Sequence, residues 1–208
     1  MDKSKLAVST YDKIAEIYTK QYFNDLTDTP YIDKFLGKLP KEANILDVGS
    51  GPGQFTKYIL DKGFQVEGVD FSDEMIVTAK KMVPSGKFRQ GDMRKLDFDE
   101  SSFDGLLVAY SLIHIPSEDI PATLKGFYRV LRSGGYIEII AQKGEADRVI
   151  DEPFMPSEKM FFNFFTKERL QAFLKDAGFE VVYQEETVSQ DPDSASDKVI
   201  YTIARKSL

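Results

Sequence analysis

The sequence contains no cysteine, no tryptophan and only one histidine in 208 residues. Without cysteine there are no disulfides, cysteine-ligated zinc sites, iron–sulfur clusters or thiol nucleophiles. A single histidine excludes histidine-rich metal sites and any mechanism that needs two imidazoles, so no metal centre is expected. The longest apolar run, near residues 106–113, is too short to span a bilayer, and the first residues lack an apolar stretch of signal-peptide length. We therefore expect a cytoplasmic protein without a membrane segment.

The charge balance is acidic, with 27 Lys and Arg against 34 Asp and Glu, for a net charge of −7. Such a balance disfavours broad contact with a nucleic-acid backbone, although it leaves a local basic patch open. The apolar fraction of 42% and the charged fraction of 29% are typical of a globular protein. The length suits one domain with a full hydrophobic core.

Short strand-like and helix-like segments alternate along most of the chain. Helices are expected around residues 11–18, from Thr29-Pro30, after Gly53, from Ser72, over 117–131 and from Thr166 to Gly178. The N-caps are expected to be Thr29, Ser72 and Thr166. Strands are expected at 44–48, 65–69, 87–90, 103–110, 136–141, 179–186 and 198–204. The connections are long enough for parallel pairing, so the pattern predicts a three-layer α/β fold.

Two segments fall outside this alternation, the 40 N-terminal residues and roughly residues 143–165. Both are expected over the carboxyl edge of the strands, where ligands bind in open α/β sheets. Residues 152–156 are expected to form an irregular loop over the same edge of the sheet. The aromatic run 160–165 is expected to pack the sheet edge, with some rings facing a substrate. The Asp- and Ser-rich stretch 189–197 is expected to be a turn or exposed loop.

The sharpest signal is the run 45–53, Ile-Leu-Asp-Val-Gly-Ser-Gly-Pro-Gly, between an expected strand and an expected helix. Glycines there allow a tight turn and a close approach to a ligand at a helix N-terminus. The dinucleotide fingerprint fails because position 54 is Gln54, and the Gly-Lys-Ser/Thr ending of a phosphate loop is absent. Asp47 would repel a pyrophosphate and would suit a ligand with an ammonium group.

Acids also follow the next two strands, at Asp70 and at Gly91-Asp92. A carboxylate at Asp70 can accept two hydrogen bonds from a ribose diol, and Asp92 could receive an adenine amino group. Each residue alone reads more simply as a turn or cap residue. Together, in this order, they indicate a nucleoside-binding edge.

These motifs, with 103–110 and Leu131-Arg-Ser-Gly-Gly135, resemble the class I S-adenosylmethionine-dependent methyltransferases, in particular their small-molecule branch. The resemblance covers about residues 10–205. It implies a Rossmann-like, seven-stranded, mostly parallel sheet with an antiparallel strand near the C-terminus, and S-adenosyl-L-methionine as the cofactor. It also implies one domain over 1–208, with a helical lid at 1–40, a cofactor-binding half at 41–142 and an acceptor-side segment at 143–208.

The resemblance implies a role for each residue of the cofactor site. The methionine and ribose would be lined by Gly49, Ser50, Gly51 and Gly53, and the ribose hydroxyls would bind to Asp70. The adenine would pack on Phe71, with its edge bound by Asp92 and Met93. The sulfonium would lie above Ala109 and Tyr110, and Tyr18, with Tyr11, would close over the methionyl end. Asp47 would act indirectly. The helical spacing of Tyr11 and Tyr18 fits core packing as well.

The acceptor is expected to be a small, partly apolar molecule, with nucleic acid unlikely, and the protein a monomer or homodimer. His114, the only histidine, follows the strand at 103–110 and could act as a general base, although a structural role fits it too. Three other functions stay open: a nicotinamide oxidoreductase, a non-catalytic cofactor-binding subunit, and a methyltransferase acting on protein or nucleic acid.

Overall fold

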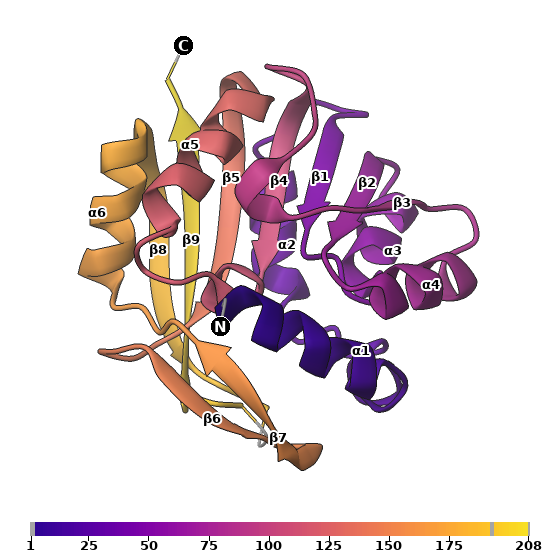
Figure 1. Ribbon diagram of the computed structural model, residues 1–208. Coiled ribbons are helices and arrows are strands. Elements are labelled where there is room, and N and C mark those ends of the chain that lie inside the picture. The colour runs from indigo at the N-terminus through magenta and orange to yellow at the C-terminus, as the bar shows by residue number, and fades with distance from the viewer. Residues whose placement is uncertain (1–2, 192–193, 208) are drawn as a thin grey trace.

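The computed structural model describes residues 3–191 and 194–207, and its centre is a seven-stranded sheet (Figure 1). The strand order is β3-β2-β1-β4-β5-β9-β8. The strands are β1 (Asn44–Val48), β2 (Gln65–Asp70), β3 (Lys87–Gln90), β4 (Phe103–Ala109), β5 (Leu131–Gln142), β8 (Phe179–Val188) and β9 (Lys198–Lys206). Strands β1 to β5 pair in parallel, and β9 runs antiparallel to both of its neighbours. The predicted mostly parallel sheet with an antiparallel strand near the C-terminus is confirmed.

Helices cover both faces of this sheet, as the alternation predicts. They are α1 (Lys3–Tyr22), α2 (Thr29–Leu36), α3 (Gln54–Asp61), α4 (Asp73–Met82), α5 (Ile120–Val130) and α6 (Lys167–Ala177), with 3₁₀ turns η1 (Met93–Lys95) and η2 (Leu112–His114). Along β4, Leu106 and Val108 pack with α5 and α6, whereas Leu107 and Ala109 pack with α2 and α3. This period of two is that of a strand buried on both faces.

Local chemistry fixes several helix boundaries where the sequence predicts them. Ser72 caps α4 by accepting a hydrogen bond from the Met75 amide at 3.1 Å, and Thr166 caps α6 through the Arg169 amide at 3.2 Å. Gly178 ends α6 with a φ of 101°, in the left-handed region.

Other boundaries differ from the prediction because a side chain is engaged elsewhere. Thr29 is the first residue of α2 and not its cap, since its hydroxyl donates to the Leu26 carbonyl at 2.6 Å. Helix α5 begins at Ile120 and not at Ser117, whose hydroxyl donates to the Asp147 carboxylate at 2.8 Å. At its other end, β5 already begins at Leu131, through a bulge in its pairing with β4.

The expected irregular loop at 152–156 is wrong, because residues 148–162 form a β-hairpin of β6 (Arg148–Glu152) and β7 (Met155–Phe162). Its turn is closed by Glu152, whose carboxylate accepts from the Met155 amide at 2.7 Å. Helix α1 contacts β7 directly, since the Thr10 hydroxyl donates to the Lys159 carbonyl at 3.0 Å. The expected loop at 189–197 has no helix or strand before β9 in its described part; residues 192–193 lie outside the described residues.

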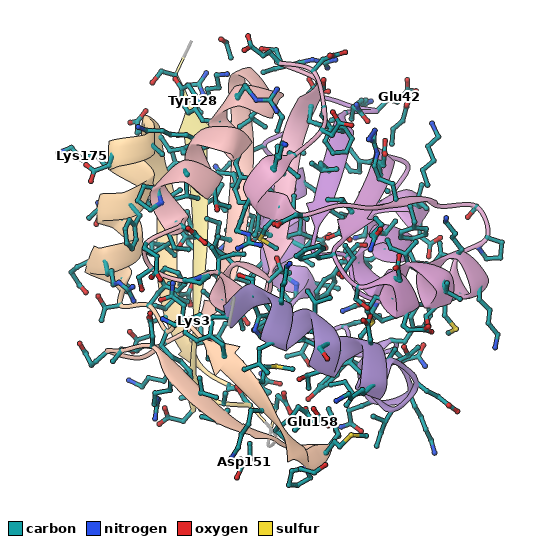
Figure 2. The ribbon with its side chains drawn as sticks, in the orientation of Figure 1. Lys3, Glu42, Tyr128, Asp151, Glu158 and Lys175 are labelled. Atoms are coloured by element: carbon teal, nitrogen blue, oxygen red, sulfur yellow. The ribbon has the colours of Figure 1, made fainter. Side chains whose placement is uncertain are left out.

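Helix α1 and the hairpin lie together beneath the edge at which β1 and β4 end (Figure 1). Figure 2 shows Asp151 and Glu158 of the hairpin at this end of the molecule, and Glu42 and Tyr128 at the opposite end. The two segments outside the alternation thus cover the expected edge. Within the part of the chain that the structure describes, no helix is long and apolar enough to cross a membrane.

One buried acid on the α2 side of the sheet is unusual. Glu138 of β5 is 0% exposed, and neither carboxylate oxygen has a hydrogen-bond partner among the described residues. Burial raises the pKa of Glu138 to about 8, helped by Asp28 and opposed by Lys34. Its carboxyl group is therefore mostly protonated at neutral pH.

We expect Glu138 to make the protein less stable as the pH rises. From its ordinary pKa of 4.5 up to about 8, the unfolded chain loses this proton while the folded chain keeps it. The free energy of unfolding should then fall, by on the order of 1 kcal/mol for each unit of the pKa shift. In Glu138→Gln the fall should be smaller by this contribution, as measured by urea unfolding between pH 5 and 9, whereas the contribution of Asp47, whose pKa is raised to about 7, should remain.

The matched control for this experiment is Glu180→Gln, at an exposed position of β8. It should keep the slope of the wild type. An equal slope in wild type and Glu138→Gln would show that Glu138 carries its charge at neutral pH.

Candidate active site

A cavity of about 820 Å³ opens where β1, β2 and β4 end, and we call it the sheet-end cavity. It lies between these strand ends and helix α1, whose residues Ser4, Ala7 and Val8 also line it. Ten of the twelve predicted site residues line it: Tyr18, Gly49, Gly51, Asp70, Phe71, Asp92, Met93, Ala109, Tyr110 and His114.

Gly49 and Gly51 shape the floor of this cavity. Gly49 has a φ of 73°, and a Cβ there would lie 2.2 Å from the Ser111 Cβ, so the loop can pass Ser111 only as glycine. Gly51 has a φ of 51°, and a Cβ there would meet only the Gln54 side chain, at 3.8 Å. A side chain at Gly51 would therefore occupy space that is open to a ligand.

Ser50 and Gly53 do not line the sheet-end cavity but support the loop from behind. Ser50 is buried, and its hydroxyl faces the backbone of β2, 2.8 Å from where a Cβ on Gly68 would stand. Gly53 precedes α3 with a φ of 89°, and a Cβ there would lie 2.8 Å from the Phe88 ring. Both residues allow the loop, helix and strand to pack closely.

The Asp70 carboxylate joins the loops that follow β1 and β2. One oxygen accepts from the Gly51 amide at 2.8 Å and the other from the Ser72 amide at 2.9 Å. Burial raises the pKa of Asp70 above its ordinary value, while these backbone N–H groups lower it. The Phe71 amide is a third backbone donor, and the carboxylate, with about four acceptor positions, still has room for a donor from the cavity.

The other two strand-end acids have different surroundings. Asp47 lies 1% exposed beneath the loop, accepts from the Thr56 hydroxyl at 2.6 Å, and has its pKa raised to about 7 by burial. Asp92 borders the cavity but is paired with Arg94, whose guanidinium lies 2.7 Å from its carboxylate. The sequence reasoning did not foresee this pairing, which spans only two residues.

Tyr110 stands at the end of β4 in an unusual conformation for a residue with a side chain, with a φ of 53°. Its hydroxyl donates to Asp28 at 3.1 Å, and the Tyr201 hydroxyl donates to the same oxygen at 2.5 Å. The Asp28 carboxylate thereby fixes the Tyr110 ring at the cavity mouth.

His114 is buried and engaged at both ring nitrogens. Its Nδ1 lies 2.9 Å from the Phe161 carbonyl oxygen and its Nε2 lies 2.9 Å from the Tyr11 hydroxyl. Since a carbonyl can only accept, Nδ1 carries the proton and the Tyr11 hydroxyl donates to Nε2. The Tyr11 ring meets the Tyr18 ring edge-on, with centroids 5.5 Å apart, so the helical tyrosines face the cavity as well as each other.

A second cavity, of about 870 Å³, lies beside the first, and we call it the outer cavity. Its walls are α1, the residues before α2, the β6–β7 hairpin and the loop before β9. Five residues line both cavities: Tyr11, Tyr18, Gln54, Phe55 and Tyr110. Met160 and Phe162 of the aromatic run line the outer cavity, whereas Phe164 and Phe165 belong to the core. The run therefore both packs the core and lines a cavity, as expected from the sequence.

Sequence reasoning missed several residues that line the sheet-end cavity. Gln54 was considered only as the missing third glycine, yet its buried Oε1 has no hydrogen-bond partner among the described residues. Its position directly after the glycine loop could have indicated it. Ser4, Ala7 and Val8 were missed because the apolar spacing became recognisable only from Tyr11 onward.

Comparison with known proteins gives consistent results. A family model described as a methyltransferase domain matches residues 45–135. An uncharacterized methyltransferase of Synechocystis is 30% identical over 66% of this chain and 67% of its own length. The demethylmenaquinone methyltransferase of Chlorobaculum tepidum is 28% identical over 74% of this chain and 61% of its own length.

A crystal structure of the Burkholderia thailandensis 1,6-didemethyltoxoflavin-N1-methyltransferase, with bound 1,6-didemethyltoxoflavin and S-adenosylhomocysteine, has a similar fold. Its TM-score is 0.77 at 22% identity, over 98% of this chain and 88% of that one.

The first curated relatives are longer, and the chain spans between 42% and 67% of their length. The matched segment contains the glycine loop, Asp70, Asp92 and His114, which also meet at one end of the sheet. The chain belongs to the class I S-adenosylmethionine-dependent methyltransferases.

Proposed function

We propose that this protein transfers a methyl group from S-adenosylmethionine to a small-molecule acceptor. The observation that carries the proposal is the contact between the two cavities. The sheet-end cavity contains the glycine loop and shares Tyr11, Tyr18 and Tyr110 with the outer cavity as lining residues. Two adjacent cavities of this size suit a small ligand.

The residues of the sheet-end cavity fit this cofactor in charge and shape. The cofactor carries a sulfonium and an ammonium against one carboxylate, and aromatic faces and acids stabilise such a ligand. The Asp70 carboxylate provides a hydrogen-bond acceptor, and Gly51 leaves room for the ligand. A pyrophosphate would meet the same acids unfavourably.

Within this cavity we assign the roles that the family resemblance implies. Asp70 would take the ribose hydroxyls, with the adenine between Phe71, Asp92 and Met93. Gly49 and Gly51 would hold the methionine and ribose through their backbone. Ser50 and Gly53 would act by keeping the loop compact. Ala109, Tyr110 and Tyr18 would surround the sulfonium and methionyl end.

The chemistry asks little of the protein beyond alignment. When bound, S-adenosylmethionine supplies a methyl group on positively charged sulfur, which leaves as a neutral thioether. The three tyrosines shared by the cavities would orient the acceptor and exclude water. The names of the demethylmenaquinone and didemethyltoxoflavin enzymes, which refer to small acceptors, support a small acceptor here. We also propose a cytoplasmic monomer or homodimer.

The proposal is tested by binding and turnover measured on the same preparation. Calorimetry should show binding of S-adenosylhomocysteine and none of NAD or NADP. A library of small acceptors with S-adenosylmethionine should yield S-adenosylhomocysteine above the background. Tight nicotinamide binding without a response to S-adenosylhomocysteine would disprove the cofactor assignment. Faster methylation of tRNA, DNA or protein than of any small molecule would disprove the acceptor assignment.

Replacing Asp70 by alanine should weaken S-adenosylhomocysteine binding by about 2–4 kcal/mol, because a charged acceptor of two hydrogen bonds is lost. Part of the loss would come from the glycine loop, since Gly51 would lose its partner. Calorimetry measures the affinity, and circular dichroism checks that the variant is folded. The matched control is Asp73→Ala, at an exposed position in the next helix that does not line the cavity. An unchanged dissociation constant in folded Asp70→Ala would remove Asp70 from the site.

We propose that His114 accepts a proton, with Tyr11 carrying it from the acceptor to Nε2. Burial lowers the pKa of His114 to about 4, so the imidazole is neutral at pH 7 and Nε2 is available. This low pKa also makes His114 a weak base, and its share of the rate should be modest.

His114→Ala should therefore lower turnover about tenfold, at or below the low end of general base catalysis, with S-adenosylhomocysteine affinity within a factor of two. Because His114 is the only histidine, ¹⁵N NMR of its imidazole can be assigned directly and should show a neutral Nδ1–H ring down to about pH 4. Turnover within twofold of wild type at every pH would mean that His114 has a structural role only.

A further inference from the structure

The outer cavity is lined by several acidic residues. Its described lining contains Asp25, Asp28, Glu152 and Asp191, and no lysine, arginine or histidine. Since the cavity faces the sheet-end cavity through shared tyrosines, a molecule bound there would lie next to the proposed cofactor. The acidic wall therefore favours a positively charged molecule over a negatively charged one.

Two of these acids are held rigidly by hydrogen bonds to neutral groups. Glu152 is 3% exposed and is fixed by the Met155 amide at the turn of the hairpin. Asp28 is fixed by the hydroxyls of Tyr110 and Tyr201. Among the described residues, neither carboxylate forms an ion pair.

The burial of these carboxylates has an energetic consequence. It raises the pKa of both Asp28 and Glu152, which means that their charged forms are poorly solvated. A cation entering the cavity would restore a partner to each charge, whereas an anion would add repulsion.

A neutral amide side chain also belongs to the same wall. Gln142 is 8% exposed and lines the outer cavity. Its Nε2 donates to the Ser194 hydroxyl at 3.0 Å, and its Oε1 has no partner among the described residues. Because carboxylates accept hydrogen bonds, a ligand with N–H or O–H donors complements the acids of this wall.

Aromatic rings form the rest of the wall. The Tyr18 and Tyr22 rings lie 4.7 Å apart, and Tyr22 meets Phe154 at 5.9 Å. Phe162 completes this lining from β7. Ring faces attract cations and pack on flat apolar molecules.

We propose that the methyl acceptor is a small aromatic molecule that carries a positively charged amine, bound in the outer cavity between Asp28 and Glu152. The inference rests on the proposed function, since it names the acceptor class of that same site. It commits to the charge and the donor groups of the acceptor, and either the amine or another atom of that molecule can receive the methyl group.

The test compares molecules that share a ring and carbon skeleton and differ in their terminal charged or neutral group. Three matched sets serve as probes: tyramine, tyrosol and 4-hydroxyphenylacetate; tryptamine, tryptophol and indole-3-acetate; and 2-phenylethylamine, 2-phenylethanol and phenylacetate. Each is titrated by calorimetry into the full chain saturated with S-adenosylhomocysteine, and each is assayed for turnover with S-adenosylmethionine. In at least one set the amine should bind tenfold or more tightly than the alcohol, and the carboxylate should bind most weakly.

Removing one charge should abolish this preference. Glu152→Gln keeps an acceptor for the Met155 amide, so the hairpin turn can still close. It should weaken amine binding tenfold or more and leave alcohol binding within twofold. Asp28→Asn, from a different segment, should give the same result. The matched control is Asp151→Asn, the adjacent residue, which is exposed and pairs with Lys159 outside the cavity (Figure 2).

The outcomes separate this inference from the proposed function. If the wild type fails to bind S-adenosylhomocysteine, the proposed function itself fails. If it binds S-adenosylhomocysteine but amines bind no better than their alcohols, including no binding of any probe at 10 mM, only the acceptor class is wrong. If Asp28→Asn and Glu152→Gln weaken S-adenosylhomocysteine without changing the amine preference, the acids belong to the cofactor, and the inference is wrong.

Discussion

The two hydrogen bonds accepted by Asp70 are the constraint on which the site depends. They tie the loop after β1, through Gly51, to the loop after β2, through Ser72. The Ser72 hydroxyl in turn donates to Asp12 at 2.6 Å and caps α4, so α1 is joined to the same centre. Loops from two strands and two helices are thus held in register by one buried carboxylate. Because its protonation would weaken acceptor contacts to both amides, the cavity and the charge state of Asp70 are physically linked.

The helix ends that are determined by interactions within one turn could be predicted from the sequence. The caps at Ser72 and Thr166 and the C-terminal glycine at Gly178 act within one turn of a helix, and they lie where the sequence places them. The cap at Thr29 and the helix start at Ser117 were predicted wrongly for the converse reason. Each hydroxyl has a partner elsewhere, at the Leu26 carbonyl and at Asp147, which no local pattern reveals.

The β6–β7 hairpin illustrates a stronger limit. Its sequence has no turn dipeptide of the common type and no clear alternation of polar and apolar residues. Its strands pack against α1 and η2. The Asn163 amide, for example, donates to the Ile113 carbonyl at 2.6 Å. Such contacts join positions about 50 to 150 residues apart, so they exist only once the sheet has assembled. The hairpin therefore forms because of tertiary packing, and sequence reasoning predicted part of it as a loop.

The same distinction separates the two cavities. Apart from the residues of α1, the cofactor-side residues follow successive strand ends between residues 49 and 115, so the periodicity of the fold brings them together and a sequence motif can record them. The acids of the outer cavity lie before α2, at the hairpin turn and in the loop before β9. No spacing connects these segments, and each acid alone reads as an ordinary surface charge. Only the folded arrangement shows that they surround one space, which is why the sequence indicates the cofactor while the charge of the acceptor has to be inferred from the structure.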